Sequence, residues 1–204
     1  MAERPPKPTD RPATPRFKKD RKAQPPGKPP VSPRRPDQHV RPQVSMLHER
    51  LVGRVIIAWG KLERAMQETI WHFLDLGVED GRLLTARNDA EDNLIILRAL
   101  GKRCLVGQGL EDFTAALDKV RARQEDRNWI AHGTWGTLMP EREPVAMNLR
   151  AKVPNQTEFM SETFPEGRMR EIVSDIEDCI EVLSRLMAGL RALRDKQKQQ
   201  AQQG

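Results

Sequence analysis

The sequence predicts an all-α fold: an up-and-down bundle of four to five helices, with a short β-hairpin or irregular excursion before the last helix. Three observations lead to this prediction. Between residues 44 and 195, apolar residues recur every three or four positions over long stretches, which is the period of an amphipathic helix. Twelve of the 16 prolines stand before residue 43. The stretch 134–164 is the one long interruption of the helical period. The length of 204 residues suits one such domain with appendages.

Residues 1–43 are predicted to form a disordered, basic, proline-rich tail, because they hold few apolar side chains to bury. They carry 12 basic and 4 acidic residues, whereas the remaining 161 carry 23 basic and 25 acidic residues. The folded part is therefore close to neutral. A basic cluster in the tail is a candidate contact for nucleic acid or an anionic surface, and the alternative is a tail that only aids solubility. The cluster consists of Lys18, Lys19, Arg21 and Lys22.

Stripes of apolar residues place the helices of the domain at 44–195. The expected helices run from about Ser45 to Leu76, from Glu79 to Cys104 with a break near Asp89, from Leu110 to His132, and from Pro165 to Asp195. Residues 196–204 are expected to fray, since they contain no large apolar side chain. Four tryptophans, Trp59, Trp71, Trp129 and Trp135, belong either to the core or a dimer interface, or stack on bases.

The excursion at 134–164 differs in character from the helices. Prolines at 140, 144 and 154 exclude a long helix. Val145, Met147 and Leu149 alternate with other residues, as the inward-facing side of a strand does. A β-hairpin and an irregular excursion are both compatible with this pattern.

Several classes of protein are not indicated by the sequence. Cys104 and Cys179 are the two cysteines and form no Cys/His cluster, so neither a metal site nor another cofactor is expected. Reduced core thiols fit a reducing compartment. No apolar run is long enough to span a membrane, and the N-terminus lacks a signal-peptide core. We therefore expect a cytoplasmic protein without membrane contact.

The residues with chemical potential lie at the end of the third expected helix. Asn128 and His132 are four residues apart and share a face. Arg127 lies about 140° around the helix from His132 and about 7.5 Å along it. A long guanidinium can reach the same face or a group on a partner chain. An imidazole can move a proton of a ribose 2′-hydroxyl, and a guanidinium can stabilise charge on a phosphate. The alternative is that His132 only caps the helix C-terminus.

The heptapeptide Arg127-Asn128-Trp129-Ile130-Ala131-His132-Gly133 resembles the signature of the HEPN domains, small helical bundles of prokaryotic conflict systems. That signature is an arginine, a polar residue, a spacer and a histidine. The expected first helix, with Trp59-Gly60-Lys61-Leu62-Glu63, is also similar to the opening helix of several HEPN branches. The resemblance covers roughly residues 45–195.

The resemblance implies a metal-independent endoribonuclease that acts as a homodimer with a composite site. Arg127 would bind the scissile phosphate, His132 would act as general acid and base, and Asn128 would orient either group. RNA is the implied substrate, and a toxin or defence role with an inhibitory protein partner is a further expectation. The alternatives are a non-catalytic binding or scaffold module of this fold, and a plain helical dimerisation domain.

Separately from the resemblance, Glu63 lies beside the apolar stripe of the first expected helix, where it could pair with Arg127 and hold it in place. The alternative is an exposed helical glutamate near Lys61 and Arg64.

Overall fold

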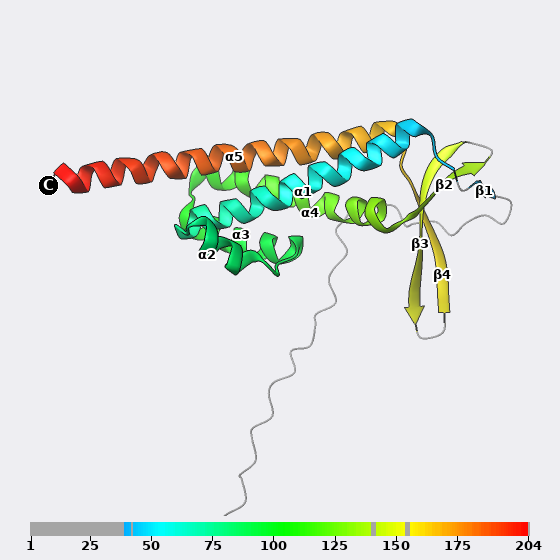
Figure 1. The fold of residues 1–204 in the computed structure, drawn as a ribbon, viewed down its shortest axis with the longest axis horizontal. Helices are drawn as coiled ribbons and strands as arrows, with labels where there is room; N and C mark the ends of the chain where they lie inside the picture. The colour runs from blue at the N-terminus through cyan, green and yellow to red at the C-terminus, as the bar shows by residue number, and fades with distance from the viewer. Residues whose placement is uncertain (1–38, 42, 140–141, 154–155, 204) are drawn as a thin grey trace, which may run out of the picture. The chain divides into compact units, whose positions relative to one another are not determined.

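The structure, a computed structural model, describes residues 39–41, 43–139, 142–153 and 156–203. In chain order the elements are β1 (His39–Arg41), α1 (Met46–Leu74), α2 (Val78–Thr85), α3 (Ala90–Cys104), α4 (Gly107–His132), β2 (Thr134–Met139), β3 (Glu143–Val153), β4 (Gln156–Thr163) and α5 (Glu166–Gln203). Figure 1 shows a helical bundle with a small antiparallel sheet at one end, formed by β1 and by the strands β2 to β4 that precede α5. The predicted fold class is confirmed.

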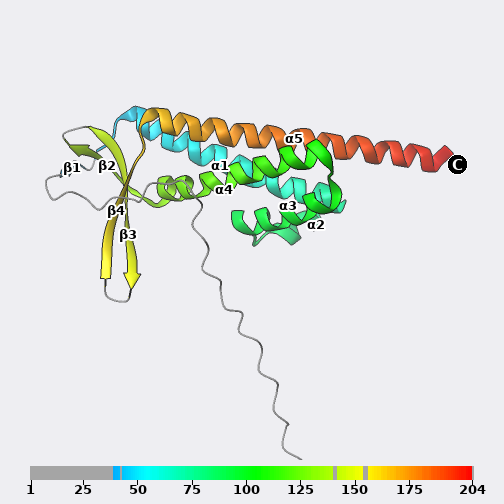
Figure 2. The same ribbon diagram turned by 180° about the vertical axis from the view of Figure 1, so that it is seen from behind.

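The long helices pack side by side along their lengths. Helices α1 and α5 both begin beside the sheet and run away from it, whereas α4 runs toward the sheet (Figures 1 and 2). An up-and-down succession of five helices gives its first and last members this shared direction. Helix α5 packs along α1, α4 contacts both, and α3 lies against α1 and α4.

One continuous core joins the helices and the sheet. Its largest fully buried side chains include Trp59, Leu62, Met66 and Ile70 from α1, Leu97 from α3, Leu117 and Ile130 from α4, and Ile172 and Ile176 from α5. Ala146 of β3 and Phe164 after β4 are also fully buried, and the Trp135 ring lies 5.7 Å from the Phe164 ring. The sheet is therefore anchored on the bundle rather than appended to it.

Local sequence signals set several helix ends. The Ser45 side chain accepts a hydrogen bond from the His48 amide at the start of α1. Asp89 forms a capping box with Asp92 and so begins α3, which confirms the break predicted near Asp89. Asp75, in a left-handed conformation with φ 56°, ends α1 two residues before the predicted end at Leu76.

Two predicted chain ends differ from the structure. Helix α5 continues beyond Asp195 to Gln203, where fraying was expected, because lysine, glutamine and alanine are good helix formers that need no buried partner. The predicted tail at 1–43 includes β1, which pairs with β2 through Val40 and Leu138. Residues 1–38 and 42 of that tail lie outside the described residues, and the basic cluster is among them.

The predicted excursion forms β2, β3 and β4, and β1 joins them in an antiparallel sheet of strand order β1-β2-β3-β4. The alternating residues from Val145 onward belong to β3, so the hairpin alternative is right and the irregular one is wrong. Strand β3 pairs with β2 through Gly136 and Val145, and with β4 through Ala146 and Glu162. A register shift lies between Ala151 and Val153.

Gly133 allows α4 to meet the sheet closely. A Cβ atom there would lie 2.6 Å from the Trp129 carbonyl oxygen and 2.8 Å from the Ala146 Cβ, neither of which can rotate away. Gly133→Ala should therefore reduce the free energy of unfolding by about 1–3 kcal/mol in urea denaturation. The matched control is Gly189→Ala on α5, where a Cβ meets nothing within 4 Å. The control should gain about 0.5–1 kcal/mol. Equal effects of both changes would refute the close-contact explanation.

His72 ties the end of α1 to α5 and makes this contact sensitive to pH. Arg191 donates to His72 Nε2 at 2.7 Å through Nη2, and Arg194 pairs with Asp75 at 2.8 Å. Burial and the two nearby arginines lower the pKa of His72, against the opposing charges of Glu68 and Asp75. The contact therefore adds stability above the unfolded-state pKa, near 6.5, and this stability is lost as the pH falls.

The measurement is the melting temperature of wild type and His72→Gln at pH 7.5 and pH 5.5. A glutamine cannot be protonated, so the variant should lose less stability between the two values than wild type does. An equal loss in both proteins would show that other groups cause the acid sensitivity.

Candidate functional site

The heptapeptide forms the last turns of α4 and the passage into β2. The Gly133 amide donates to the Trp129 carbonyl at 2.8 Å, and the Trp135 indole N–H donates to the Ile130 carbonyl at 3.1 Å. These bonds satisfy carbonyl groups that a helix end leaves without intrahelical partners. They also fix the direction in which the chain leaves His132.

Arg127 points from α4 toward α1. Its Nη1 donates to Asn128 Oδ1 at 3.1 Å, its Nη2 lies 3.8 Å from Glu63 Oε1, and its Cζ lies 5.7 Å from the centroid of the Trp59 ring. Its Nε is buried and has no hydrogen-bond partner among the described residues. The side chain is 28% exposed. The guanidinium is thus held by charge and by a ring, while most of its five N–H donors make no hydrogen bond within the described part of the chain.

The pairing of Glu63 with Arg127 appears in the structure as an ion pair without a hydrogen bond. Glu63 is itself held, because the Trp59 indole N–H donates to Glu63 Oε1 at 2.8 Å. Trp59 is 2% exposed, so its ring is a fixed support rather than a surface for stacking bases. Sequence reasoning missed this role of Trp59, although the four-residue spacing from Glu63 was a visible signal.

Asn128 and His132 are exposed on the outer side of α4. Arg121 and Glu125 share this exposed side at helical spacing. Within the described residues, the contacts of Arg127 are with Asn128, Glu63 and Trp59 and do not include His132. One chain therefore brings together Arg127, Asn128 and Glu63, with His132 about a turn and a half away at the helix end.

A buried carboxylate fixes the turn that carries Arg127. Asp126 is 2% exposed and accepts from Arg168 Nη2 at 2.7 Å and from Arg123 Nη1 at 3.1 Å. Arg168 also donates to Glu162 at 2.6 Å and to the Thr163 carbonyl at 2.7 Å. Asp126 thus ties α4 to α5 and to the end of β4. The sequence does not distinguish this aspartate from the exposed acids of the same helix.

The charged contacts continue along α4 and α5. Arg123 donates to Asp175 and Glu171, and Lys119 lies 3.1 Å from Asp175. Burial alone would raise the pKa of Asp175, but hydrogen bonds from Arg123 and Lys119 lower it below its ordinary value. The cluster holds the two helices together along the turns of α4 that precede Arg127.

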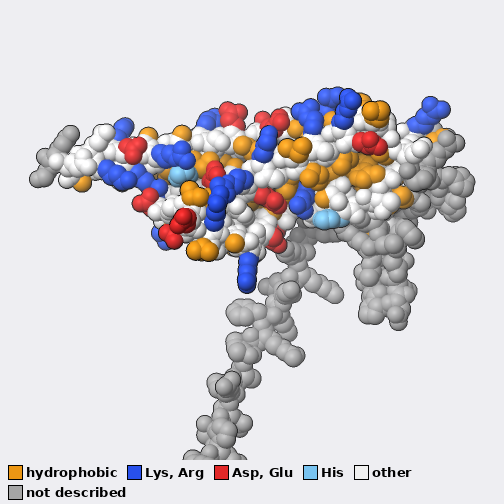
Figure 3. Space-filling model, in the orientation of Figure 1, with side chains coloured by type: hydrophobic (Ala, Val, Ile, Leu, Met, Phe, Trp, Pro, Cys, Tyr) orange, Lys and Arg blue, Asp and Glu red, His pale blue; other side chains and the backbone are white. Residues whose placement is uncertain are grey.

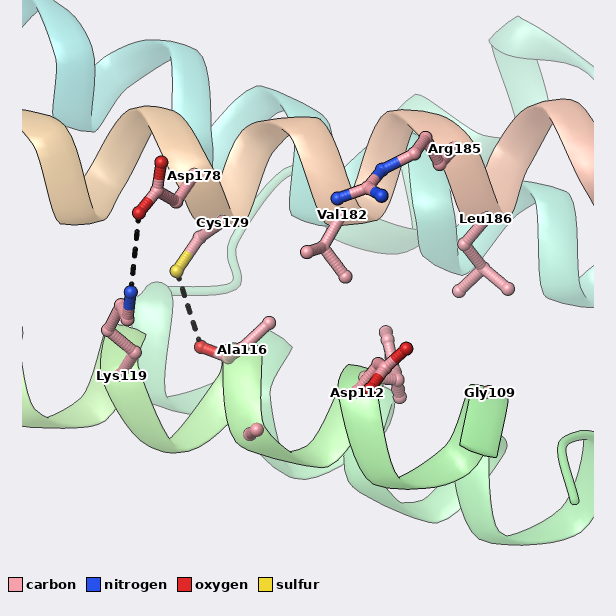
Figure 4. Close-up of a pocket in the computed structure, with 11 residues that line it drawn as sticks. Gly109, Asp112, Ala116, Lys119, Asp178, Cys179, Val182, Arg185 and Leu186 are labelled. Carbon is pink, nitrogen blue, oxygen red and sulfur yellow. Dashed lines mark hydrogen bonds and ion pairs between the residues drawn. The ribbon is translucent and has the colours of Figure 1, made fainter. Parts of the chain in front are cut away.

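A cleft of about 420 Å³ lies between α4 and α5 (Figure 4). Val182 and Leu186 project from α5 toward α4, and Lys119 pairs with Asp178 across the cleft at 3.4 Å. The Cys179 thiol donates to the Ala116 carbonyl at 3.4 Å, and burial raises the pKa of this thiol to about 11. A thiol of such high pKa is a poor nucleophile at neutral pH, so the cleft contains no activated cysteine.

The four tryptophans pack in or against the core, as one of the two alternatives for them predicted. Trp59, Trp71 and Trp129 are between 2% and 4% exposed and belong to the core, while Trp135 is partly buried against it. Among the described residues, no group of three or more His, Cys, Asp or Glu is placed to hold a metal ion. No helix in the described ranges combines the length and apolar character that crossing a bilayer requires.

Comparison with known protein families, with curated proteins and with solved structures finds no match to this chain. The chemical interpretation of the site therefore rests on its own residues and on the resemblance of the heptapeptide.

Proposed function

We propose that this chain is a metal-independent endoribonuclease of the HEPN type. The observation that carries the proposal is the state of Arg127. Its guanidinium is held in place by Glu63 and Trp59. Most of its donors make no hydrogen bond to any described residue, and the exposed His132 follows in the last turn of the same helix. A fixed, partly desolvated guanidinium with open donors suits a phosphate, which accepts two parallel N–H bonds.

In the proposed reaction, Arg127 binds the non-bridging oxygens of the scissile phosphate and stabilises the added negative charge. His132 removes the proton from the adjacent 2′-hydroxyl. The 2′-oxygen forms a bond to phosphorus as the bond from phosphorus to the 5′-oxygen breaks. The leaving oxygen takes up a proton, so the products are a 2′,3′-cyclic phosphate and a 5′-hydroxyl. Asn128 accepts from Arg127 and orients it.

A second copy of the chain completes this site in the proposal. Within one chain, Arg127 is directed toward α1, whereas His132 is exposed about 140° farther around α4. Two chains related by a two-fold axis beside the exposed side of α4 can bring the arginine of one toward the histidine of the other. RNA is the proposed substrate, and a protein that covers this side of α4 would act as an inhibitor.

The test is cleavage of single-stranded RNA by the purified protein in EDTA, with analysis of the new chain ends. Cyclic phosphate and 5′-hydroxyl ends in the presence of chelator would support the proposal. No cleavage by the concentrated, folded protein, or cleavage only with added metal, would contradict it. If the folded protein does not cleave RNA, a binding or scaffold module of the same fold becomes the better explanation.

Glu63→Ala should lower kcat for cleavage by about five- to tenfold, because an ion pair of this exposure contributes roughly 1 kcal/mol to fixing Arg127. Glu63→Gln keeps an acceptor for the Trp59 indole and should lose less. The matched control is Glu68→Ala on the same helix, which breaks the 2.7 Å pair with Arg64 instead. A loss in the control as large as that in Glu63→Ala would argue against a role specific to Glu63.

A further inference from the structure

A groove with segregated charge lies between α1 and α5. It encloses about 510 Å³, and its apolar floor includes Ile57 and Ile180. The edge on α1 carries Arg54 and Lys61, whereas the edge on α5 carries Glu177 and Glu181. One edge is thus wholly basic and the other wholly acidic in its charged side chains.

The charges along this groove are largely uncompensated by other side chains in the described part of the chain. Arg54, Lys61 and Glu177 are exposed and make no ion pair with any described residue. Glu181 lies 3.7 Å from Arg185, but both side chains are about 70% exposed, so this pair contributes little. The edges are therefore available for charges on another molecule.

The apolar floor of the groove leaves room for another helix to pack closely against α1. Ile57 is 63% exposed, although it lies in the middle of a helix of 29 residues. Gly53 and Gly60 lie about one turn before and after it, and a Cβ at either glycine would meet nothing within 4 Å. Ile57 thus projects between two bare stretches of backbone, where a second helix can approach. Figure 3 shows hydrophobic side chains gathered among charged ones along one face of the helices.

We propose that the groove between α1 and α5 is an interface with a second copy of this chain. Two copies facing each other about a two-fold axis parallel to the helices place α1 of each against α5 of the other. Arg54 and Lys61 of one copy then lie opposite Glu177 and Glu181 of its partner, and the reverse pairs form by symmetry. The apolar floors meet between the two sets of charges. An axis across the helices would instead oppose like charges, so the charge pattern selects the first arrangement.

This interface is separate from the proposed nuclease site. Lys61 and Glu63 are two residues apart and so lie on nearly opposite sides of α1. Glu63 faces Arg127 on α4, and Lys61 faces the groove. The association described here therefore adds to any contact between α4 faces and does not depend on RNA cleavage.

The test is sedimentation equilibrium of the full chain with matched variants. Ile57→Asp should weaken one association step at least about 30-fold, as expected for an apolar residue at the centre of an interface. Ile95→Asp is the control, because Ile95 is a helical isoleucine of similar exposure, 59%, outside the groove. Two outcomes would overturn the proposal. One is that the wild-type chain does not associate. The other is that Ile57→Asp weakens association no more than Ile95→Asp does.

Charge exchange tests the arrangement of the two copies. The variant Arg54→Glu with Lys61→Glu, and the variant Glu177→Lys with Glu181→Lys, should each associate at least about tenfold more weakly than wild type. An equal mixture of the two should regain association, because every α1 edge then faces an α5 edge of opposite sign. If the mixture does not associate although circular dichroism shows that both variants are folded, the pairing of α1 with the partner's α5 is overturned. RNA cleavage measured alongside should stay unchanged in these variants, so failure of the nuclease proposal would be seen separately.

Discussion

His132→Ala is expected to reduce RNA cleavage by about 10²–10⁴-fold, which is the usual contribution of a general acid or base. Arg127→Ala should cause a loss of similar size, because the phosphate would lose the guanidinium that Glu63 and Trp59 hold in place. Rates are measured in EDTA under single-turnover conditions. Under these conditions, neither metal contamination nor product release affects the comparison.

Arg121→Ala is the matched control for both variants, since Arg121 is exposed on the same side of α4, about three turns before His132. It should change the binding of RNA only modestly. Mixing Arg127→Ala with His132→Ala tests the composite site, because a mixed dimer retains one arginine and one histidine. If either single variant cuts at the wild-type rate while remaining folded, the heptapeptide is not the catalytic site.

The periodic parts of the fold were predictable because they follow from short-range physics. Stripes of apolar residues placed α1 and α5, and the Asp89 signal placed the start of α3, since a capping box is formed by residues within one turn. The extension of α5 to Gln203 was not predicted, because the absence of apolar residues was given more weight than helix propensity. Pairing of β1 with β2 joins residues about a hundred positions apart, which no local pattern reveals.

The same distinction holds for the candidate site. Arg127, Asn128 and His132 were found through their spacing in one helix, and the contact between Glu63 and Arg127 was one of two alternatives that the place of Glu63 on the first helix left open. The contacts that hold these residues in place were not predicted from the sequence. Trp59 supports Glu63 within α1, and Asp126 is buried because Arg168, far along the chain, reaches it. Such support depends on tertiary packing, so a sequence alone ranks Asp126 with the exposed acids around it.

Asp126→Ala is expected to reduce the free energy of unfolding by about 3 kcal/mol, because it removes the acceptor shared by two partly buried arginines. In this variant, Arg123 would still pair with Asp175, and Arg168 would still pair with Glu162. The expected loss of stability is therefore at the lower end of the range for breaking a buried ion pair. The measurement is urea denaturation monitored by tryptophan fluorescence.

Asp118→Ala is the matched control, since Asp118 lies on the same helix and also accepts from an arginine, Arg98, at 2.6 Å. The Asp118 side chain is 64% exposed, so its loss should cost less than about 1 kcal/mol. Similar costs for the two variants would show that burial does not determine the strength of these pairs. A large cost at Asp126 alone would mean that the turn carrying Arg127 depends on a contact between α4, β4 and α5. Loss of cleavage in Asp126→Ala would then reflect this displaced turn, whereas His132→Ala leaves the turn intact and reports on the chemistry.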